Sequence, residues 1–238
     1  MSDPVAIADR LAAIRERVAR AAVRVGRRPE DIAVVGVAKR VPAPRVVAAV
    51  RAGLCDVAES YAQEARDKLP QIRAMLEEVD CNPPRLHFIG QLQRNKARVV
   101  AKDFDVVHTV DRESLGAELD RRAGAAARRL EVLLQVDLSG EAGKGGADRA
   151  RLRELLVASH AWSQLRVIGL MAIPAPRDDP EASRPAFAEL RGLRDGLVGH
   201  AGAEHLIELS MGMSHDFEVA VEEGATIVRI GTAIFGAR

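Results

Sequence analysis

The chain of 238 residues has little cysteine and almost no excess of charge of either sign. Its two cysteines, Cys55 and Cys81, have neither pairing nor metal-ligand spacing, so we expect free thiols in a reducing cytoplasm and no metal site. The formal net charge is +1, with both signs spread along the chain, and this distribution lacks the basic footprint of a nucleic-acid-binding or membrane-binding surface. These absences argue against nucleic acid, metal and membrane partners.

The N-terminal segment also lacks a long apolar run. Asp3, Asp9 and Arg10 interrupt it, so the segment is not expected to be a signal peptide. The pattern predicts a helix instead, because Pro4 suits the first helical position and four apolar residues recur on one face before Gly26, namely Ile7, Leu11, Ile14 and Val18.

Short apolar runs recur along the chain with charge-rich, helix-like segments between most of them. They occupy residues 32–37, 54–57, 86–89, 106–110, 132–136, 167–171, 206–209 and 227–230. Continuous apolar runs are typical of parallel strands that are covered on both faces. We therefore predict an α/β fold, a (β/α)8 TIM barrel, with an open two-sided sheet as the alternative.

The length fits a single domain spanning residues 1–238, because such barrels typically have roughly 250 residues. The loop-like stretches 139–146 and 174–180 directly follow predicted strands and are interpreted as βα loops. Only residues 235–238 remain after the last strand and its loop, which is too few for a full eighth outer helix. The extra N-terminal helix is predicted to cover that gap.

Two segments rich in small residues follow the last two predicted strands. They are Ser210-Met211-Gly212-Met213-Ser214 and Arg229-Ile230-Gly231-Thr232. Barrels commonly bind phosphate with backbone N–H groups in the loops after strands seven and eight, so these segments predict a phosphate site. Ser214 also lies where an N-cap would start a helix that ends at Gly224.

Lysine is scarce, with five lysines against thirty arginines, and Lys39 lies at the end of the first predicted strand. Barrel active sites form at that rim, and a primary amine can condense with a carbonyl ligand, which arginine cannot do. The neighbouring Arg40 favours the unprotonated amine. The alternative is a surface lysine that starts a loop.

An amine facing a phosphate site predicts a phosphorylated aldehyde or ketone as ligand, and pyridoxal 5′-phosphate fits that description. Arg229 lies two residues before Gly231, so its side chain is predicted to point into the barrel. A guanidinium can only donate hydrogen bonds, which suits an unprotonated pyridine nitrogen. A structural arginine paired with barrel carboxylates remains the alternative.

Six motifs in chain order resemble the pyridoxal phosphate homeostasis protein family, the single-domain relatives of the alanine racemase barrel. They are Ala38-Lys39, Ala58-Glu59-Ser60-Tyr61-Ala62-Gln63-Glu64, residues 87–96, Gly169-Leu170-Met171-Ala172-Ile173-Pro174, residues 209–216 and residues 228–236. The resemblance implies a non-catalytic cytoplasmic protein that binds pyridoxal 5′-phosphate and contributes to vitamin B6 homeostasis, with apo forms of enzymes that need this cofactor as partners. The lack of a swapped catalytic domain favours a monomer.

Carried over by resemblance, Lys39 would form the aldimine, Arg229 would contact the ring nitrogen, and the phosphate contacts would be Ser214, Gly231 and Thr232, with Met213 adding a backbone contact. The sequence departs from the family where Ser60 replaces the usual asparagine, and also at Arg40 and Gln91. These departures could alter loop shape and affinity.

Ser60 is a further candidate contact of the cofactor, and three other residues keep two interpretations each. Ser60 and Tyr61 follow the second strand, and Tyr61 is either a rim packing residue or a neighbour of the cofactor ring. His87 lies inside an apolar strand, where it either bonds to its neighbours or touches the cofactor. Lys144 is either a solvated loop lysine or a second amine that acts during ligand release.

Two enzyme classes compete with the carrier. An amino acid racemase needs a second base on the other face of the cofactor, usually a tyrosine from a further domain, and the sequence contains no such domain after the eighth strand. A Schiff-base aldolase typically carries its lysine on the sixth strand, and residues 167–171 contain none. A weak racemase-like side activity of Lys39 remains compatible with the sequence.

Overall fold

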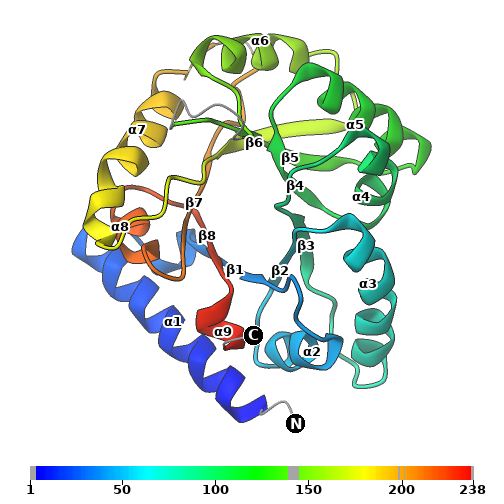
Figure 1. Cartoon of the computed structure of the whole chain (residues 1–238), viewed down its shortest axis with the longest axis vertical. Helices are drawn as coiled ribbons and strands as arrows, with labels where there is room; N and C mark the ends of the chain where they lie inside the picture. The colour runs from blue at the N-terminus through cyan, green and yellow to red at the C-terminus, as the bar shows by residue number, and fades with distance from the viewer. Residues whose placement is uncertain (1–3, 139–144, 198, 201, 237–238) are drawn as a thin grey trace.

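The computed structural model describes residues 4–138, 145–197, 199–200 and 202–236. Within these residues, parallel strands close into a barrel in chain order, with β1 paired to β8 at the seam (Figure 1). The strands are β1 (Ala33–Val37), β2 (Asp56–Glu59), β3 (Arg85–Phe88), β4 (Val106–Val110), β5 (Leu130–Gln135), β6 (Leu165–Met171), β7 (Glu208–Met213) and β8 (Ile227–Ile230). The predicted (β/α)8 barrel is confirmed.

Every connection between successive strands carries a helix, and these helices surround the barrel (Figure 1). The α-helices are α1 (Pro4–Arg24), α2 (Ala43–Arg51), α3 (Ala62–Glu77), α4 (Ala97–Asp103), α5 (Glu113–Ala125), α6 (Arg149–Ser159), α7 (Arg184–Asp195), α8 (Phe217–Glu222) and α9 (Thr232–Phe235). Three short 3-10 helices join them: η1 (Pro29–Asp31), η2 (Arg94–Lys96) and η3 (Pro180–Ser183).

Helix α1 covers the side of the barrel where the outer helix after β8 is reduced to the short α9. It buries Ile7, Leu11, Ile14 and Val18, the four apolar residues that the sequence places on one face of the helix. It packs against α2, α8 and the four-residue α9, and Arg10 Nε donates to the carbonyl oxygen of Ile234 at 2.8 Å. The prediction that the N-terminal helix compensates for a missing eighth helix is confirmed.

Two predicted strands are displaced along the chain. The second was expected at 54–57 and spans Asp56–Glu59, because Leu54 packs into the outer core before the ladder with β1 begins at Asp56. The seventh was expected at 206–209 and spans Glu208–Met213. Residues 210–213 therefore belong to the strand, where Ser210 pairs with β6 and Met213 pairs with β8, and they do not form a loop.

The barrel encloses a small apolar cluster that is separate from the larger core between strands and helices. Its buried members are Val35, Val37, Ala58, Val106, Leu133, Ile168, Met171 and Ile227. Four polar side chains on the barrel strands are also buried: His87 on β3, His108 on β4, Ser210 on β7 and Arg229 on β8. Such polar groups are costly to bury unless they are hydrogen-bonded, so their partners are informative.

Three further observations concern the expected partners. No helix of the described ranges is long and apolar enough to cross a membrane. Cys55 and Cys81 are free. Within the part of the chain that the structure describes, no group of three or more histidine, cysteine, aspartate or glutamate side chains could hold a metal ion.

Candidate functional site

A pocket of about 330 Å³ opens at the carboxyl ends of the strands. Its lining comes from the ends of β1, β2, β3, β6, β7 and β8: Val37, Lys39, Ser60, Ile89, Ile173, Met213, Ser214, His215, Arg229, Gly231 and Thr232. The structure thus brings the predicted amine and both small-residue segments to one opening. This volume lies in the range of small-molecule sites, and the mixed apolar and polar lining is typical of them.

Lys39 lies in the turn between β1 and α2 and is half-buried. Its amine makes no hydrogen bond or ion pair with any described residue, although it lines the pocket. The turn itself is fixed from α3, because Lys68 Nζ donates to the carbonyl oxygens of Ala38 at 2.8 Å and Val41 at 3.0 Å. A positioned turn therefore carries an amine that has no partner among the described residues.

The charge of Lys68 is balanced by two carboxylates. Its Nζ lies 2.7 Å from Glu59 Oε1 and 2.8 Å from Glu64 Oε1. Glu59 is fully buried, and this burial raises the pKa of its carboxyl to about 7 against the opposing effect of the Lys68 ammonium. Sequence analysis selected Lys39 for the site and gave Lys68 no role.

The loops after β7 and β8 are joined by a hydrogen bond in which the Gly231 N–H donates to Ser214 Oγ at 3.3 Å. The expected helix N-cap role of Ser214 is wrong, because a turn closes first and Asp216 precedes α8. In that turn the Met213 N–H donates to Asp216 Oδ1 at 2.8 Å. Thr232 begins α9, so its N–H has no acceptor within that helix.

Arg229 is buried, with 3% of its surface exposed, and reaches the pocket from the barrel interior. Its guanidinium donates to Ser210 Oγ at 2.6 Å and to the carbonyl oxygen of Ala172 at 2.9 Å. Burial lowers the pKa of Arg229 to about 10, partly offset by Asp216, so the group stays protonated at neutral pH. These two bonds use only part of the five N–H groups of the guanidinium, and Arg229 lines the pocket.

Ser60 lines the pocket, and Gly90 packs so closely on its backbone that a Cβ at Gly90 would lie 1.9 Å from the Ser60 carbonyl oxygen. Tyr61 does not line the pocket; it is 47% exposed, and the Arg40 guanidinium lies 5.8 Å from its ring centroid. Of its two interpretations, the rim packing residue matches this position.

His87 does not line the pocket either. It is fully buried among barrel side chains, 2.8 Å from His108 and 2.9 Å from Asp56, so it bonds to neighbouring side chains and does not face the pocket. Lys144 lies outside the described residues. Sequence analysis missed Val37, Ile89 and Ile173, whose apolar side chains carry no chemical signal.

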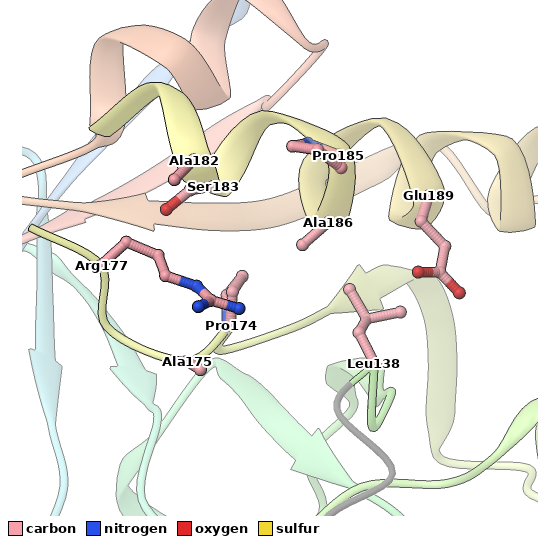
Figure 2. Close-up of a pocket in the computed structure, with 9 residues that line it drawn as sticks. All are labelled: Leu138, Pro174, Ala175, Arg177, Ala182, Ser183, Pro185, Ala186 and Glu189. Atoms are coloured by element: carbon pink, nitrogen blue, oxygen red, sulfur yellow. The ribbon is translucent and has the colours of Figure 1, made fainter. Parts of the chain in front are cut away.

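A second pocket of about 390 Å³ lies between the segment after β6 and the α7 helix (Figure 2). The Arg177 guanidinium extends into it and Glu189 lies at its far end. None of the residues predicted from the sequence lines it. The first pocket is therefore the candidate site, because a buried guanidinium, the ends of the two small-residue segments and an amine without a partner among the described residues converge there.

Comparison with known proteins agrees with this geometry. The family model "Alanine racemase, N-terminal domain" matches residues 10–238. The chain is thus a barrel of the alanine racemase N-terminal class. Among curated relatives, the pyridoxal phosphate homeostasis protein of Escherichia coli (strain K12) is 40% identical over 236 residues, covering 98% of this chain and 97% of the relative. The chain belongs to the pyridoxal phosphate homeostasis protein family.

Two further relatives support the assignment. The protein of the same name from Pseudomonas aeruginosa is 42% identical over 232 residues, covering 98% of this chain and 96% of the relative. PipY of Synechococcus elongatus, whose structure was solved with PLP bound, is 36% identical, with a TM-score of 0.83 over 97% of this chain and 100% of PipY. The similarity therefore extends over the whole barrel.

Proposed function

We propose that this protein binds pyridoxal 5′-phosphate in the pocket at the carboxyl ends of the strands, attached covalently through the Lys39 amine. It holds the cofactor for release to apo enzymes and so contributes to vitamin B6 homeostasis. The observation that carries this proposal is the Lys39 amine, which has no partner among the described residues and shares one pocket of about 330 Å³ with a buried guanidinium and the ends of the two small-residue segments. The names and the ligand of the relatives support it.

The chemistry of the lining residues fits each part of this ligand. An amine condenses with an aldehyde by losing water, which requires a group not already engaged in an ion pair, as Lys39 is among the described residues. Ser214 and Thr232 supply hydroxyl and backbone N–H donors for a phosphate. The N–H groups of Gly231 and Met213 would have to exchange Ser214 Oγ and Asp216 Oδ1 for phosphate oxygens. When bound, the pyridine ring supplies an electron sink whose strength depends on its nitrogen.

Arg229 sets that strength, since a protonated guanidinium can only donate to the ring nitrogen and thus disfavours its protonation. Enzymes that need strong stabilisation of a carbanion commonly have a carboxylate beside the ring nitrogen instead. Racemisation also needs a second base facing the Lys39 amine. The only pocket-lining imidazole among the described residues, that of His215, lies 2.9 Å from the Asp178 carbonyl oxygen through Nε2. A non-catalytic role follows.

The proposal includes a single-domain monomer in the cytoplasm. The free Cys55 and Cys81 thiols suit a reducing compartment. The large hydrophobic side chains exposed on the described surface belong to several separate segments: Val5, Val23, Val25, Tyr61, Val79, Val157, Ile173 and Ile207. A monomer is expected to sediment with the mass of one 25.7 kDa chain, both without and with the cofactor.

Lys39→Ala is expected to abolish covalent attachment while leaving the fold intact, because Lys39 is half-buried at a rim and packs in no core. The protein is mixed with pyridoxal 5′-phosphate, reduced with borohydride and digested, and the adduct is located by peptide mass. Lys102→Ala is the matched control, since Lys102 is exposed on α4 and does not line the pocket. An adduct on another lysine, or an unchanged adduct in Lys39→Ala, contradicts the proposal.

A further inference from the structure

A continuous row of buried polar side chains crosses the barrel interior from Arg229 to Asp56. Arg229 donates to Ser210 Oγ at 2.6 Å, and Ser210 Oγ lies 2.9 Å from His108 Nδ1. His108 Nε2 lies 2.8 Å from His87 Nδ1, and His87 Nε2 lies 2.9 Å from Asp56 Oδ1. The row connects β8, β7, β4, β3 and β2, and it links the pocket to the opposite end of the barrel.

The two ends of this row define the direction of every hydrogen bond in it. A guanidinium can only donate, so Ser210 Oγ accepts from Arg229 and has one proton left to give. A carboxylate can only accept, so His87 must carry its proton on Nε2, facing Asp56. His87 Nδ1 then accepts from His108 Nε2, and His108 Nδ1 accepts the proton of Ser210. Every donor meets one acceptor, and both imidazoles are neutral.

The reverse arrangement leaves one group unsatisfied. If His108 carried its proton on Nδ1, Ser210 Oγ would accept twice and its own buried hydroxyl proton would have no partner on this row. His87 would then need two protons, forming an imidazolium with 0% exposure in the same interior as a buried guanidinium. Burial also holds the pKa of His108 well below its usual range, with the charge of Arg229 acting in the same direction.

The row ends in the pocket because Arg229 lines it. The guanidinium plane is fixed by two acceptors, Ser210 Oγ within β7 and the carbonyl oxygen of Ala172 directly after β6. Removing the Ser210 acceptor leaves one anchor and frees the plane to rotate. The orientation of the donors that face the pocket thus depends on residues that never reach it.

We infer that Ser210, His108, His87 and Asp56 form a directional hydrogen-bond relay that positions the Arg229 guanidinium for the ring nitrogen of the bound cofactor. This inference rests on the proposed function for the identity of the ligand. The relay itself is a property of the chain without ligand. The four residues are positioning residues, and Arg229 is the one that makes the contact.

The first test reads the proton positions directly in the protein without ligand. Nitrogen-15 NMR of histidine-labelled protein is expected to show His87 and His108 as neutral imidazoles, each with its proton on Nε2. Variants His87→Asn and His108→Asn assign the two signals. A proton on His108 Nδ1, or a charged His87 at neutral pH, overturns the relay whether or not the protein binds pyridoxal 5′-phosphate.

The second test measures positioning in the loaded protein. Ser210→Ala is expected to weaken pyridoxal 5′-phosphate binding by about tenfold, because a hydrogen bond to a charged group is lost, and to change the absorbance maximum of the bound cofactor. Ser210→Thr keeps the hydroxyl and is expected to restore both. Ser183→Ala is the control, since Ser183 is equally buried and lies outside the relay.

The outcomes separate the two proposals. Unchanged affinity and spectrum in Ser210→Ala overturn the relay while the proposed function stands. If the wild-type protein does not retain pyridoxal 5′-phosphate, the proposed function is overturned, and so is the role of the relay in cofactor binding. The proton positions on the two histidines still decide whether the directional row exists. If Ser210→Ala does not fold, the NMR measurement on the wild-type protein decides the direction alone.

Discussion

At the scale of single residues, two lysines near the pocket differ in their partners and not in their chemistry. Lys68 Nζ is surrounded by two carbonyl oxygens and two carboxylates, whereas Lys39 has none of these among the described residues. The scarcity of lysine does not distinguish one of the five lysines in the sequence from another. Only Lys39 could be assigned a role there, because it directly follows a strand, while the partners of Lys68 come from three separate segments.

Glu59→Gln is expected to change how stability depends on pH. The raised pKa of Glu59, about 7 in the fold, means that the folded state binds its proton more tightly than the unfolded state, where the value is 4.5. The tighter binding of this proton in the folded state therefore stabilises the wild type fully below pH 4.5, and this stabilisation is lost as the pH rises toward 7. As the pH rises from about 4.5 to about 8, the free energy of unfolding of the variant should increase relative to that of the wild type by on the order of 2–3 kcal/mol.

Urea unfolding at several pH values measures this difference. Glu16→Gln is the control, because Glu16 has 69% of its side chain exposed and pairs only with the exposed Arg20. That variant should follow the wild type within about 0.5 kcal/mol at each pH. Stability curves of Glu59→Gln and wild type that run parallel over the whole range would show that burial does not perturb Glu59.

At the scale of elements, β7 shows what a hydrophobic pattern misses. The apolar pair Leu206 and Ile207 predicted an earlier strand, but Ile207 is 66% exposed and the ladder with β8 extends to Met213. Polar and small residues continue this strand because their backbone groups pair on both sides, which no side-chain pattern encodes. Ser210 therefore belongs to the barrel interior, although the sequence suggested a loop.

Gly212→Ala is expected to destabilise the protein and weaken phosphate binding. Gly212 has a φ of +89°, and a Cβ there would lie 2.5 Å from Ala220 Cβ and 3.0 Å from Phe217 Cα. Strain and overpacking should cost about 1–3 kcal/mol and shift α8 away from β7. Gly192→Ala on α7 is the control, since nothing lies within 4 Å of its added Cβ.

The control variant Gly192→Ala should have a free energy of unfolding about 0.5–1 kcal/mol higher than the wild type, because alanine is favoured over glycine in a helix interior. Both variants are compared by urea unfolding and by titration with pyridoxal 5′-phosphate. Equal stability and affinity in Gly212→Ala and the wild type would mean that the end of β7 tolerates a side chain, contrary to its packing.

Helix α1 is expected to contribute to the stability of the whole barrel. Leu11 is 1% exposed in the core that α1 forms with its neighbours, so Leu11→Ala should cost about 2–5 kcal/mol. Val23, on the same helix but 67% exposed, provides the control Val23→Ala with an effect within about 0.5 kcal/mol. A single unfolding transition should persist in both variants. A Leu11→Ala variant as stable as wild type would mean that α1 is dispensable.

At the scale of the molecule, the barrel could be predicted because its signal repeats eight times, and an error of two residues in one strand does not change the count. The hydrogen bonds inside the barrel could not be predicted from the sequence. His108 was not singled out, and its partners His87 and Ser210 are 21 and 102 residues away in the chain. Only the closed barrel brings them within hydrogen-bond distance, so their connection depends on topology and register.

The proposed ligand would bridge the seam at which the barrel closes, because Lys39 follows β1 and Gly231 follows β8, and these strands pair. Binding to the folded state alone should raise the free energy of unfolding by about 2.7 kcal/mol when pyridoxal 5′-phosphate is present at 100 times its Kd. At the same concentrations, pyridoxal without phosphate should stabilise the wild type less, and pyridoxal 5′-phosphate should stabilise Lys39→Ala less. Urea unfolding measures these three conditions, each against the same protein without ligand. Equal stabilisation by the two vitamers would show that the loops of Ser214 and Gly231 do not bind the phosphate.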